Sequence, residues 1–416
     1  MRAQRLVAVL LAAAMAGLLI AACGGSDKSG GGCVGGSMKM SDGSVMCDSA
    51  MHDAGSGGSG HASNTTGTHT AGMNVRSGNS TTVPEVNGVA PVATQTLATR
   101  YWQGMEIQAQ TRTPVRFIQF AGNQAQVVNP PKGASFHLMV MLSDAHTGEP
   151  MPYSGSVWAT ITNSAGHRVY DAQQWPMISA YMGPHYGDNV SRLASGRYQL
   201  TILIGTPISA RTREYKNVWL KPHTVTMSFR WSAKTATATV IRSGKSAGST
   251  GPMSGMSGMA IHTNVAVNGV KATPSRVLGT AYWQGMKIQT RRATPTPLYI
   301  AGGNDTTKSI QQAAGSSFYM MVMLNDRYTG EAVTYAPVSA TIKDRSGKVV
   351  YRGTMQPTIS AFEGPYYGND VKLPGAGRYT LTLRIDPPHQ ARHVEYQHVW
   401  LKPHTVVEHF AWNGGR

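Results

Sequence analysis

The sequence predicts an all-β protein that contains one domain twice, and two observations support this fold class. Segments rich in β-branched and aromatic residues, such as 157–162, 197–204 and 224–231, are punctuated by Gly, Pro, Asn and Asp, and no helical periodicity of convincing length is present. Several motifs also recur at a constant spacing. Short strands with frequent turns are typical of antiparallel sandwiches, so we expect two tandem β-sandwich domains of immunoglobulin-like type.

The internal repeat has a nearly constant spacing: three motifs recur 181 residues further along the chain, and around His137 the offset is 182. A constant offset over this span indicates two homologous copies with few insertions. The recurring motifs are Val-Asn-Gly-Val at 86–89 and 267–270, Tyr-Trp-Gln-Gly-Met at 101–105 and 282–286, and Val-Trp-Leu-Lys-Pro-His-Thr at 218–224 and 399–405.

Low-complexity segments divide the rest of the chain. Residues 23–85 are rich in Gly, Ser and Thr, and such a segment is expected to be a flexible tether because it cannot bury enough apolar surface to fold. Residues 234–266 have a similar composition and are expected to form a linker. The two domains are therefore predicted to span 86–233 and 267–416.

Length and composition exclude several classes of protein. The 416 residues suffice for two to four domains of roughly 100–200 residues, but three cysteines cannot staple a chain of this size. A single long apolar run argues against a polytopic membrane protein, and a hydrophobic content of 41% argues against a wholly disordered chain. The excess of 22 methionines and 14 histidines remains to be explained.

Residues 1–22 have the features of an export signal, with Arg2 and Arg5 before an apolar stretch. The stretch ends in Leu-Ile-Ala-Ala before Cys23, which resembles the lipobox of bacterial lipoproteins. This resemblance implies that Cys23 is lipidated and holds the protein in the cell envelope, on the extracytoplasmic face of the membrane. An ordinary cleaved signal or a short membrane anchor is the alternative.

One predicted strand of the first copy carries candidate metal ligands. In the segment 135–142 alternate side chains share a face, so the apolar set should enter the core while His137, Met139 and Met141 line the opposite face. Imidazole and thioether groups both bind copper, and thioether favours Cu(I). For this strand alone, packing of the methionines under a neighbouring loop is the alternative.

A second segment adds three candidates. Met177 and Met182 precede Gly-Pro-His185-Tyr-Gly-Asp-Asn, and its Gly-Pro and Gly-Asp-Asn runs predict a loop with His185 at a rim of the domain. A loop His with two nearby methionines, in a domain that also offers His137 and Met139, predicts a metal pocket.

These segments together resemble the bacterial periplasmic iron-transport proteins. The resemblance rests on Trp-Gln-Gly-Met-Glu-Ile at 102–107, the strand with His137, Pro-Met at 176–177, Gly-Pro-His-Tyr-Gly at 183–187 and Gly-Arg-Tyr-Gln-Leu-Thr at 196–201. It implies an immunoglobulin-like, dimeric protein that binds copper and supports iron uptake through a high-affinity iron permease.

The resemblance also implies a ligand set, from which this chain departs twice in its first copy. The set consists of a His and a carboxylate two apart on a strand, a Met, the His of the loop, and a late His that follows an Arg. His137, Met177 and His185 match, whereas Met139 stands at the carboxylate position and Thr212 at the late His position.

The second copy departs in the opposite places. Tyr319, Thr358 and Tyr366 replace the first three matching ligands, but the late His is present as His393. We therefore predict a fused pseudo-dimer in which His393 completes the site of His137, Met139, Met177 and His185 across the interface, while the mirror site is inactive. The alternative is that the first copy binds metal with its own residues and His393 is a surface residue.

The softer donor set favours copper, as Cu(I) or Cu(II), over Fe²⁺ because a thioether replaces a hard oxygen ligand. Iron is expected elsewhere, for example near Glu106. Mobile thioethers in the linker are candidates for collecting Cu(I), with compositional drift as the alternative, and Cys33 and Cys47 of the tether could pair or bind metal. The auxiliary candidates are thus Met182, Glu106, Met253, Met256 and Met259.

The net charge of +17 comes from scattered basic residues, and export removes nucleic acid as a partner, so weak attraction to the anionic membrane surface is expected. No nucleophile–base pair, elbow serine or phosphate loop is present, and we expect no enzymatic activity. With the family resemblance, these features predict a lipid-anchored extracytoplasmic copper protein that assists iron uptake beside a permease. A periplasmic Cu(I) storage or delivery protein with no iron role, and a pair of structural adhesion modules, are the alternatives. The expected membrane partner is an iron permease or another metal transporter.

Overall fold

The computed structural model describes residues 85–121, 124–240, 265–302, 305–310 and 313–414, and the backbone of two short paired strands, β1 (Ser37–Lys39) and β2 (Val45–Cys47). The short strands belong to a first unit, residues 1–66, which is separate from the unit formed by residues 67–416. The predicted export signal with Cys23, Cys33 and the methionines of the linker lie outside the described residues. Within the described ranges, no helix has the length and apolar character needed to span a membrane.

The larger unit confirms the predicted all-β class. Beside the strands, the described part of this unit contains two single-turn 3-10 helices, η1 (Arg213–Tyr215) and η2 (Val394–Tyr396), and a short hairpin of β16 (Ala266–Val267) and β17 (Val270–Lys271). Each copy of the repeat contributes one large and one smaller sheet, which form the tandem β-sandwiches expected from the sequence.

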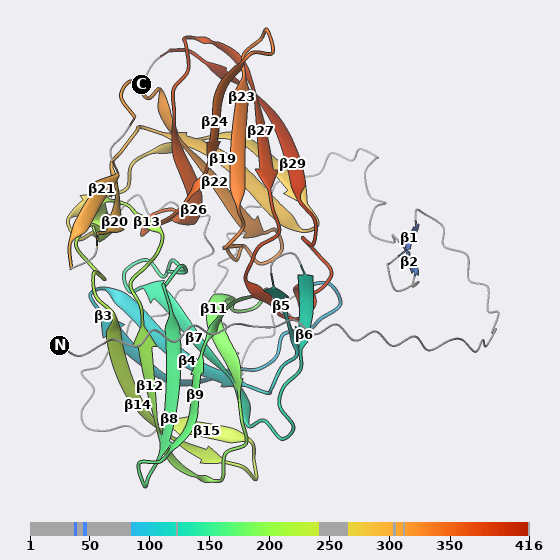
Figure 1. Ribbon diagram of the computed structural model, residues 1–416, viewed down its shortest axis with the longest axis vertical. Helices are drawn as coiled ribbons and strands as arrows, with labels where there is room; N and C mark the ends of the chain where they lie inside the picture. Colours follow the sequence, from blue (N-terminus) through green and yellow to red (C-terminus); the bar gives the residue numbers. More distant parts are fainter. Residues whose placement is uncertain are drawn as a thin grey trace, which may run out of the picture. The chain divides into compact units, whose positions relative to one another are not determined.

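In the first copy the large sheet has the strand order β3-β4-β7-β11-β10-β28-β5-β6 and the smaller sheet has the order β15-β14-β12-β8-β9 (Figure 1). The large sheet contains β3 (Gln95–Trp102), β4 (Met105–Arg112), β7 (Phe136–Asp144), β11 (Gly183–Val190), β10 (Trp175–Ser179), β28 (Ala391–Arg392), β5 (Phe117–Ala121) and β6 (Gln124–Val128). The smaller sheet contains β15 (Thr237–Val240), β14 (His223–Ser232), β12 (Gly196–Ile204), β8 (Val157–Asn163) and β9 (Arg168–Gln173).

The second copy repeats this plan with the orders β18-β19-β22-β26-β25-β13-β20-β21 and β24-β23-β27-β29. Its large sheet contains β18 (Ser275–Trp283), β19 (Met286–Ala293), β22 (Phe318–Asp326), β26 (Gly364–Val371), β25 (Gln356–Ser360), β13 (Ala210–Arg211), β20 (Leu298–Ala301) and β21 (Thr307–Ile310). Its smaller sheet contains β24 (Val349–Thr354), β23 (Val338–Lys343), β27 (Gly377–Ile385) and β29 (His404–Trp412).

The two copies exchange one strand each. β28 belongs to the second copy in sequence, yet it pairs in parallel with β10 and antiparallel with β5 of the first copy. β13 of the first copy takes the equivalent place between β25 and β20, where Figure 1 shows it among the strands of the second copy. The large sheet of either copy is therefore complete only with a strand from the other.

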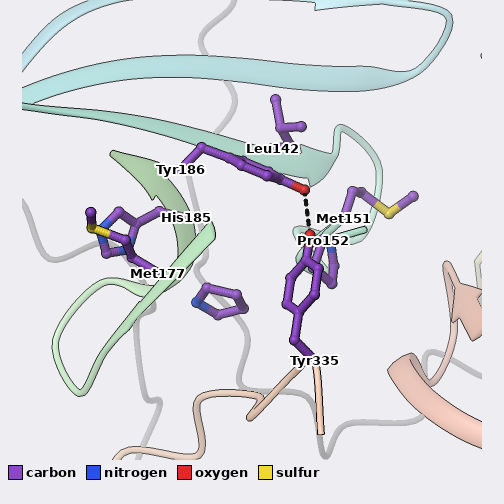
Figure 2. A pocket seen from close by; sticks show the side chains of 8 residues that line it. Leu142, Met151, Pro152, Met177, His185, Tyr186 and Tyr335 are labelled. Atoms are coloured by element: carbon purple, nitrogen blue, oxygen red, sulfur yellow. Dashed lines mark hydrogen bonds between the residues drawn. The ribbon is translucent and has the colours of Figure 1, made fainter. Parts of the chain in front are cut away.

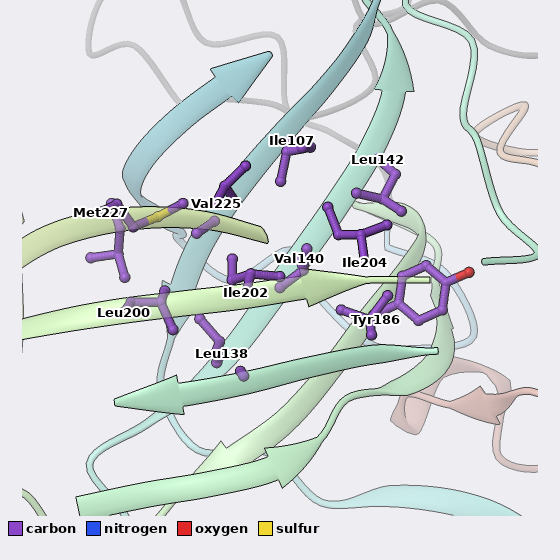
Figure 3. Packing of buried hydrophobic residues seen from close by; sticks show 14 of the residues in the cluster. Ile107, Leu138, Val140, Leu142, Tyr186, Leu200, Ile202, Ile204, Val225 and Met227 are labelled. Carbon is purple, nitrogen blue, oxygen red and sulfur yellow. The ribbon is translucent and has the colours of Figure 1, made fainter. Parts of the chain in front are cut away.

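The alternation predicted for β7 is confirmed. Phe136, Leu138, Val140 and Leu142 are buried in the core between the two sheets of the first copy, where they pack against residues of β12 and β14 (Figure 3). Burial of such side chains contributes roughly 1.5–3 kcal/mol each. Because side chains alternate along a strand, His137 is directed to the opposite face of the large sheet.

Equivalent aromatic contacts hold the scaffold in both copies. The buried Trp219 donates a hydrogen bond from its indole nitrogen to the backbone oxygen of Trp102 at 3.2 Å, and His223 stacks on the Trp102 ring with a centroid separation of 4.7 Å. Since the contacts recur, these side chains belong to the scaffold. The second copy repeats both contacts with Trp400, Trp283 and His404.

Candidate metal centre

The face of the large sheet that is turned away from the core gathers the candidate ligands of the first copy. Across the strand ladder, His137 lies opposite Arg112 on one side and Asn189 on the other, and Met177 of β10 lies opposite His185 of β11. Residues that oppose each other in an antiparallel ladder project on the same side of the sheet. The pairing therefore brings these side chains to one face.

Three imidazoles meet on this face. His137 comes from β7, His185 from β11, and His393 directly follows the exchanged strand β28. One nitrogen of each ring lies within 4.8 Å of the others, and the ring centroids are 5.0–6.3 Å apart. In the part of the chain that the structure describes, this is the only such group of three His, Cys, Asp or Glu side chains, and it contains no carboxylate.

The predicted loop around His185 is wrong. Residues Gly183–Val190 form β11, and His185 is only 3% exposed instead of lying at a rim. Pairing with β7 and β10 on both sides overrides the local turn preference of the Gly-Pro and Gly-Asp-Asn sequences. Gly187 serves close packing here, because a Cβ atom at this position would lie 2.8 Å from Nε2 of His137.

Hydrogen bonds orient two of the three rings. The amide of Asn189 is fixed by Val115, whose N–H donates to Oδ1 at 3.0 Å and whose carbonyl accepts from Nδ2 at 2.8 Å. Nδ1 of His137 therefore donates to the same Oδ1, at 3.3 Å, while Nδ1 of His185 donates to the carbonyl of Gly183 at 3.0 Å. In both rings Nε2 keeps its lone pair, which is the arrangement that metal-binding histidines adopt.

Burial keeps all three rings neutral. It lowers the pKa of His185 to about 4 and places the pKa of His137 and of His393 well below the usual value of 6.5. The positive charge of Arg112 adds to the depression of all three pKa values. Neutral imidazole is the form that binds metals, so the rings need not lose a proton at pH 7.

The polar atoms of this group are unsatisfied in a way that fits a metal ion. Nε2 of His137, of His185 and of His393 are all buried and lack a hydrogen-bond partner. A buried polar group without a partner costs roughly 1–3 kcal/mol. The three rings also lie close enough for one cation to contact a nitrogen of each, so the donor set fits a bound metal.

Two of the methionines on the same face as the three histidines, Met139 and Met177, are fully buried. Met177 packs against Phe117 and Ala391 and lines, with His185, a cavity of about 10 Å³ (Figure 2). Met139 lies two residues after His137 on β7 and opposite a glycine of β11. Both methionine side chains therefore project from the same face of the sheet as the imidazoles.

Of the auxiliary candidates, the structure describes Met182 and Glu106. Met182 is buried in the turn between β10 and β11. Glu106 lies six residues before Arg112 on β4, which separates them by about 20 Å along the strand. Burial raises the pKa of Glu106. Met253, Met256 and Met259 fall outside the described residues.

Sequence reasoning missed Arg112 as a residue of the centre. Its Nη1 lies 3.4 Å from Nδ1 of His393, and a guanidinium can only donate in this contact. The sequence does not show that Arg112 lies opposite His137, because the register between β4 and β7 is set only in the folded sheet. A signal was nevertheless present, since the equivalent position 181 residues later is Ala293.

The equivalent place in the second copy has a different chemistry. Tyr319 and Tyr366 contact each other there with ring centroids 6.3 Å apart, within an apolar cluster that includes Met321. Burial raises the pKa of both phenols. Thr212, which follows the exchanged strand β13, has its hydroxyl 2.6 Å from the Glu214 carboxylate. This place lacks the imidazoles that the first copy assembles.

Comparison with known proteins assigns the family. A family model described as "Fe2+ transport protein" matches residues 103–233 and 325–414, which together make up more than half of the chain. The chain belongs to this iron-transport family. Both copies of the repeat contain a matched segment, so the internal duplication joins two iron-transport domains.

Curated and solved relatives match single segments of this chain. UPF0423 proteins of Brucella abortus (strain 2308) and Brucella suis biovar 1 (strain 1330) are each 34% identical over 94 residues, covering 20% of this chain and 51% of the relative. The chain thus spans about half the length of these curated relatives. FetP of uropathogenic E. coli strain F11 is 22% identical with a TM-score of 0.29, and a copper-bound variant of P19 from Campylobacter jejuni is 20% identical with a TM-score of 0.29. Each structure match covers 34% of this chain and 99% of the other.

Proposed function

We propose that this iron-transport family member binds one copper ion at the centre formed by His137, His185 and His393, with Met139 and Met177 as thioether ligands. The observation that supports the proposal is the convergence of three buried, neutral imidazoles whose Nε2 atoms have no partner. Bound copper would supply a redox-active, thiophilic ion at this face. The protein's contribution is a site whose donor atoms are buried, uncharged and in part oriented in advance.

The donor set supports copper, and Cu(I) in particular, over iron. Two thioethers and three imidazoles offer soft and borderline donors, whereas Fe²⁺ prefers a share of hard oxygen ligands. Among the described residues, the group of side chains whose donor atoms lie within 4.8 Å of one another consists of three histidines and contains no carboxylate. Met139, at the position where the family resemblance implies a carboxylate, is the residue that makes the difference.

The site requires both copies of the repeat, which supports the internal pseudo-dimer. His393 reaches the first copy through β28, and its backbone N–H donates to the carbonyl of Ile178 at 3.1 Å. Thr212 makes the reciprocal contact, donating to the carbonyl of Ile359 at 3.2 Å. The same exchange therefore delivers a histidine to one side and a threonine to the other.

In the cell, we infer that the protein works at the extracytoplasmic face of the membrane, lipid-anchored through Cys23, and assists iron uptake beside an iron permease. The family assignment supports the link to iron transport. A second function, Cu(I) storage or delivery without an iron role, is favoured by the absence of a carboxylate from the three-histidine group.

Copper titration of the purified protein against a Cu(I) chelator tests the site. We expect His393→Ala to weaken the tightest copper equivalent at least about 100-fold, because one of a small number of ligands is lost. Thr212→Ala is the matched control, since it alters the reciprocal position of the same strand exchange, and it should leave the affinity unchanged. An unchanged affinity in His393→Ala would overturn the shared site.

Growth of a deletion strain separates the two cellular functions. A strain complemented with His393→Ala should grow poorly under iron limitation if the copper centre assists iron uptake. A defect that appears only under copper stress, with normal growth at low iron, would favour Cu(I) storage or delivery instead.

A further inference from the structure

Arg112 is a charged side chain at the centre that is not among the proposed copper ligands. It is the last residue of β4, it lies opposite His137 in the ladder, and its Nη1 is 3.4 Å from Nδ1 of His393. The guanidinium is half-buried, and its Nε atom is buried without a hydrogen-bond partner. A cation thus lies directly beside a group of side chains that is expected to take up another cation.

The carboxylate whose negative charge acts on Arg112 is not part of the three-histidine group. Glu395 is the carboxylate whose charge acts on the guanidinium. Its Oε1 accepts hydrogen bonds from the Ser179 hydroxyl at 2.7 Å and from the Ala180 N–H at 2.9 Å, so its position is set by the turn after β10. The imidazole group itself contains no carboxylate.

The second copy shows that the fold does not need this guanidinium. Ala293 occupies the equivalent place, opposite Tyr319 in the ladder of β19 and β22, just as Arg112 is opposite His137. The scaffold contacts around Glu395 are nevertheless repeated around Glu214 in the other half. Arg112 therefore accompanies the three histidines and not the sandwich.

Arg112 has two separable effects on a metal ion. First, the guanidinium donates to Nδ1 of His393, so the neutral ring carries its proton on Nε2. An ion can bind Nε2 only after that proton moves to Nδ1, which breaks the contact with the guanidinium. This competition weakens all ions alike. Second, the fixed positive charge repels the ion, and the Coulomb energy is proportional to the ion's charge, so a divalent ion is opposed twice as strongly as a monovalent one.

We propose that Arg112 determines the charge selectivity of the centre, so that it admits monovalent Cu(I) and discriminates against divalent ions. The proposal rests on the proposed copper function. It makes Arg112, which is not a metal ligand, a determinant of the specificity of the centre. It also implies a raised Cu(II)/Cu(I) reduction potential, because the oxidised ion is the more strongly repelled form.

The test compares Arg112→Gln, which removes the charge, with Arg112→Lys, which keeps it. Affinities for Cu(I), Cu(II) and redox-inert Zn²⁺ are measured by chelator competition on the purified protein. We expect Arg112→Gln to strengthen Zn²⁺ and Cu(II) binding at least about tenfold more than Cu(I) binding, which lowers the potential by about 59 mV for each tenfold difference. Arg112→Lys should retain the wild-type ratio of affinities.

Two further variants complete the experiment. Arg112→Ala introduces the residue that the second copy carries at this place, so it provides a tolerated side chain if the glutamine variant does not fold. Arg116→Gln removes an exposed neighbouring cation, whose Nη2 bonds Oε1 of Gln397 at 2.7 Å, and it should leave the ratio unchanged. Equal changes in Cu(I) and Zn²⁺ affinity in the Arg112 variants would overturn the charge selectivity while leaving the copper site intact. An unchanged copper affinity in His393→Ala would overturn both proposals.

Discussion

The equivalent places in the two copies of the repeat differ in chemistry while sharing one scaffold. In the first copy three neutral imidazoles converge, whereas in the second two neutral phenols fill the same location. Both copies share the strand exchange and the stacked Trp–His pair. In both, a backbone N–H also donates to a buried carboxylate, that of Glu395 or of Glu214. A handful of side chains therefore decides whether this fold can hold a metal, and the fold alone does not.

The largest expected effect concerns the exchanged strands, whose buried arginines are not equivalent. The Arg392 guanidinium donates to the carbonyls of Val399, Pro388 and Trp400, whereas that of Arg211 donates to the carbonyl of Val218. Arg392→Ala should reduce the free energy of unfolding by about 3–5 kcal/mol, since it leaves buried carbonyls unpaired and opens a cavity.

Arg211→Ala is the matched comparison and should cost less, because fewer hydrogen bonds are lost. Chemical denaturation of both variants measures the difference. Equal losses would show that the two exchanged strands contribute alike, against the contacts that distinguish them.

The second prediction concerns exchanging the equivalent side chains His185 and Tyr366 between the two copies. His185→Tyr introduces the side chain found at Tyr366 and should weaken copper binding about 100-fold, because a neutral phenol replaces an imidazole ligand. The reciprocal change Tyr366→His is the control for the fold and should leave the affinity of the first-copy centre unchanged. Copper titration of both variants reads out the result, and retained tight binding in His185→Tyr would contradict the ligand role of His185.

The third prediction concerns the room that β11 leaves for His137. In Gly187→Ala the new Cβ would lie 2.8 Å from Nε2 of His137, so the ring must move and copper binding should weaken about tenfold, with a stability loss of about 1–3 kcal/mol. Gly375→Ala is the control, since no atom lies within 4 Å of its Cβ position. Similar affinities in both variants would mean that the position of His137 is not critical.

The last prediction concerns how the stability of the apo protein depends on pH. The folded-state pKa values of His137, His185 and His393 lie below the ordinary value of 6.5, and that of His185 is about 4. Between these values the unfolded chain binds more protons, so stability is full above about pH 7 and is lost as the pH falls toward 4, by up to about 1.4 kcal/mol per pH unit for each ring. Replacing His185 by Tyr should reduce this slope. Thermal unfolding across the pH range measures it, and a flat profile would show that the rings are solvated.

The sequence by itself determined the features that depend on local patterns, namely which side chains of a strand share a face and where the repeat lies. The alternation in 135–142 correctly assigned one face to the core and directed His137 and Met139 to the other, because side chains of a strand alternate whatever its neighbours are. The constant repeat offset identified two homologous domains. Comparing equivalent positions singled out His393 as the histidine that the first copy lacks, since the complementary losses are visible without any coordinates.

The tertiary structure alone decided how these residues meet. It made Gly183–Val190 a central strand and buried His185, because pairing on both sides outweighs local turn preference. It carried His393 across to the first copy through β28, and it set Arg112 against that ring. It also separated Glu106 from the centre along β4. Register and strand exchange arise from contacts between distant segments, such as that between Arg112 and His393, which are 281 residues apart, and no local pattern encodes such contacts.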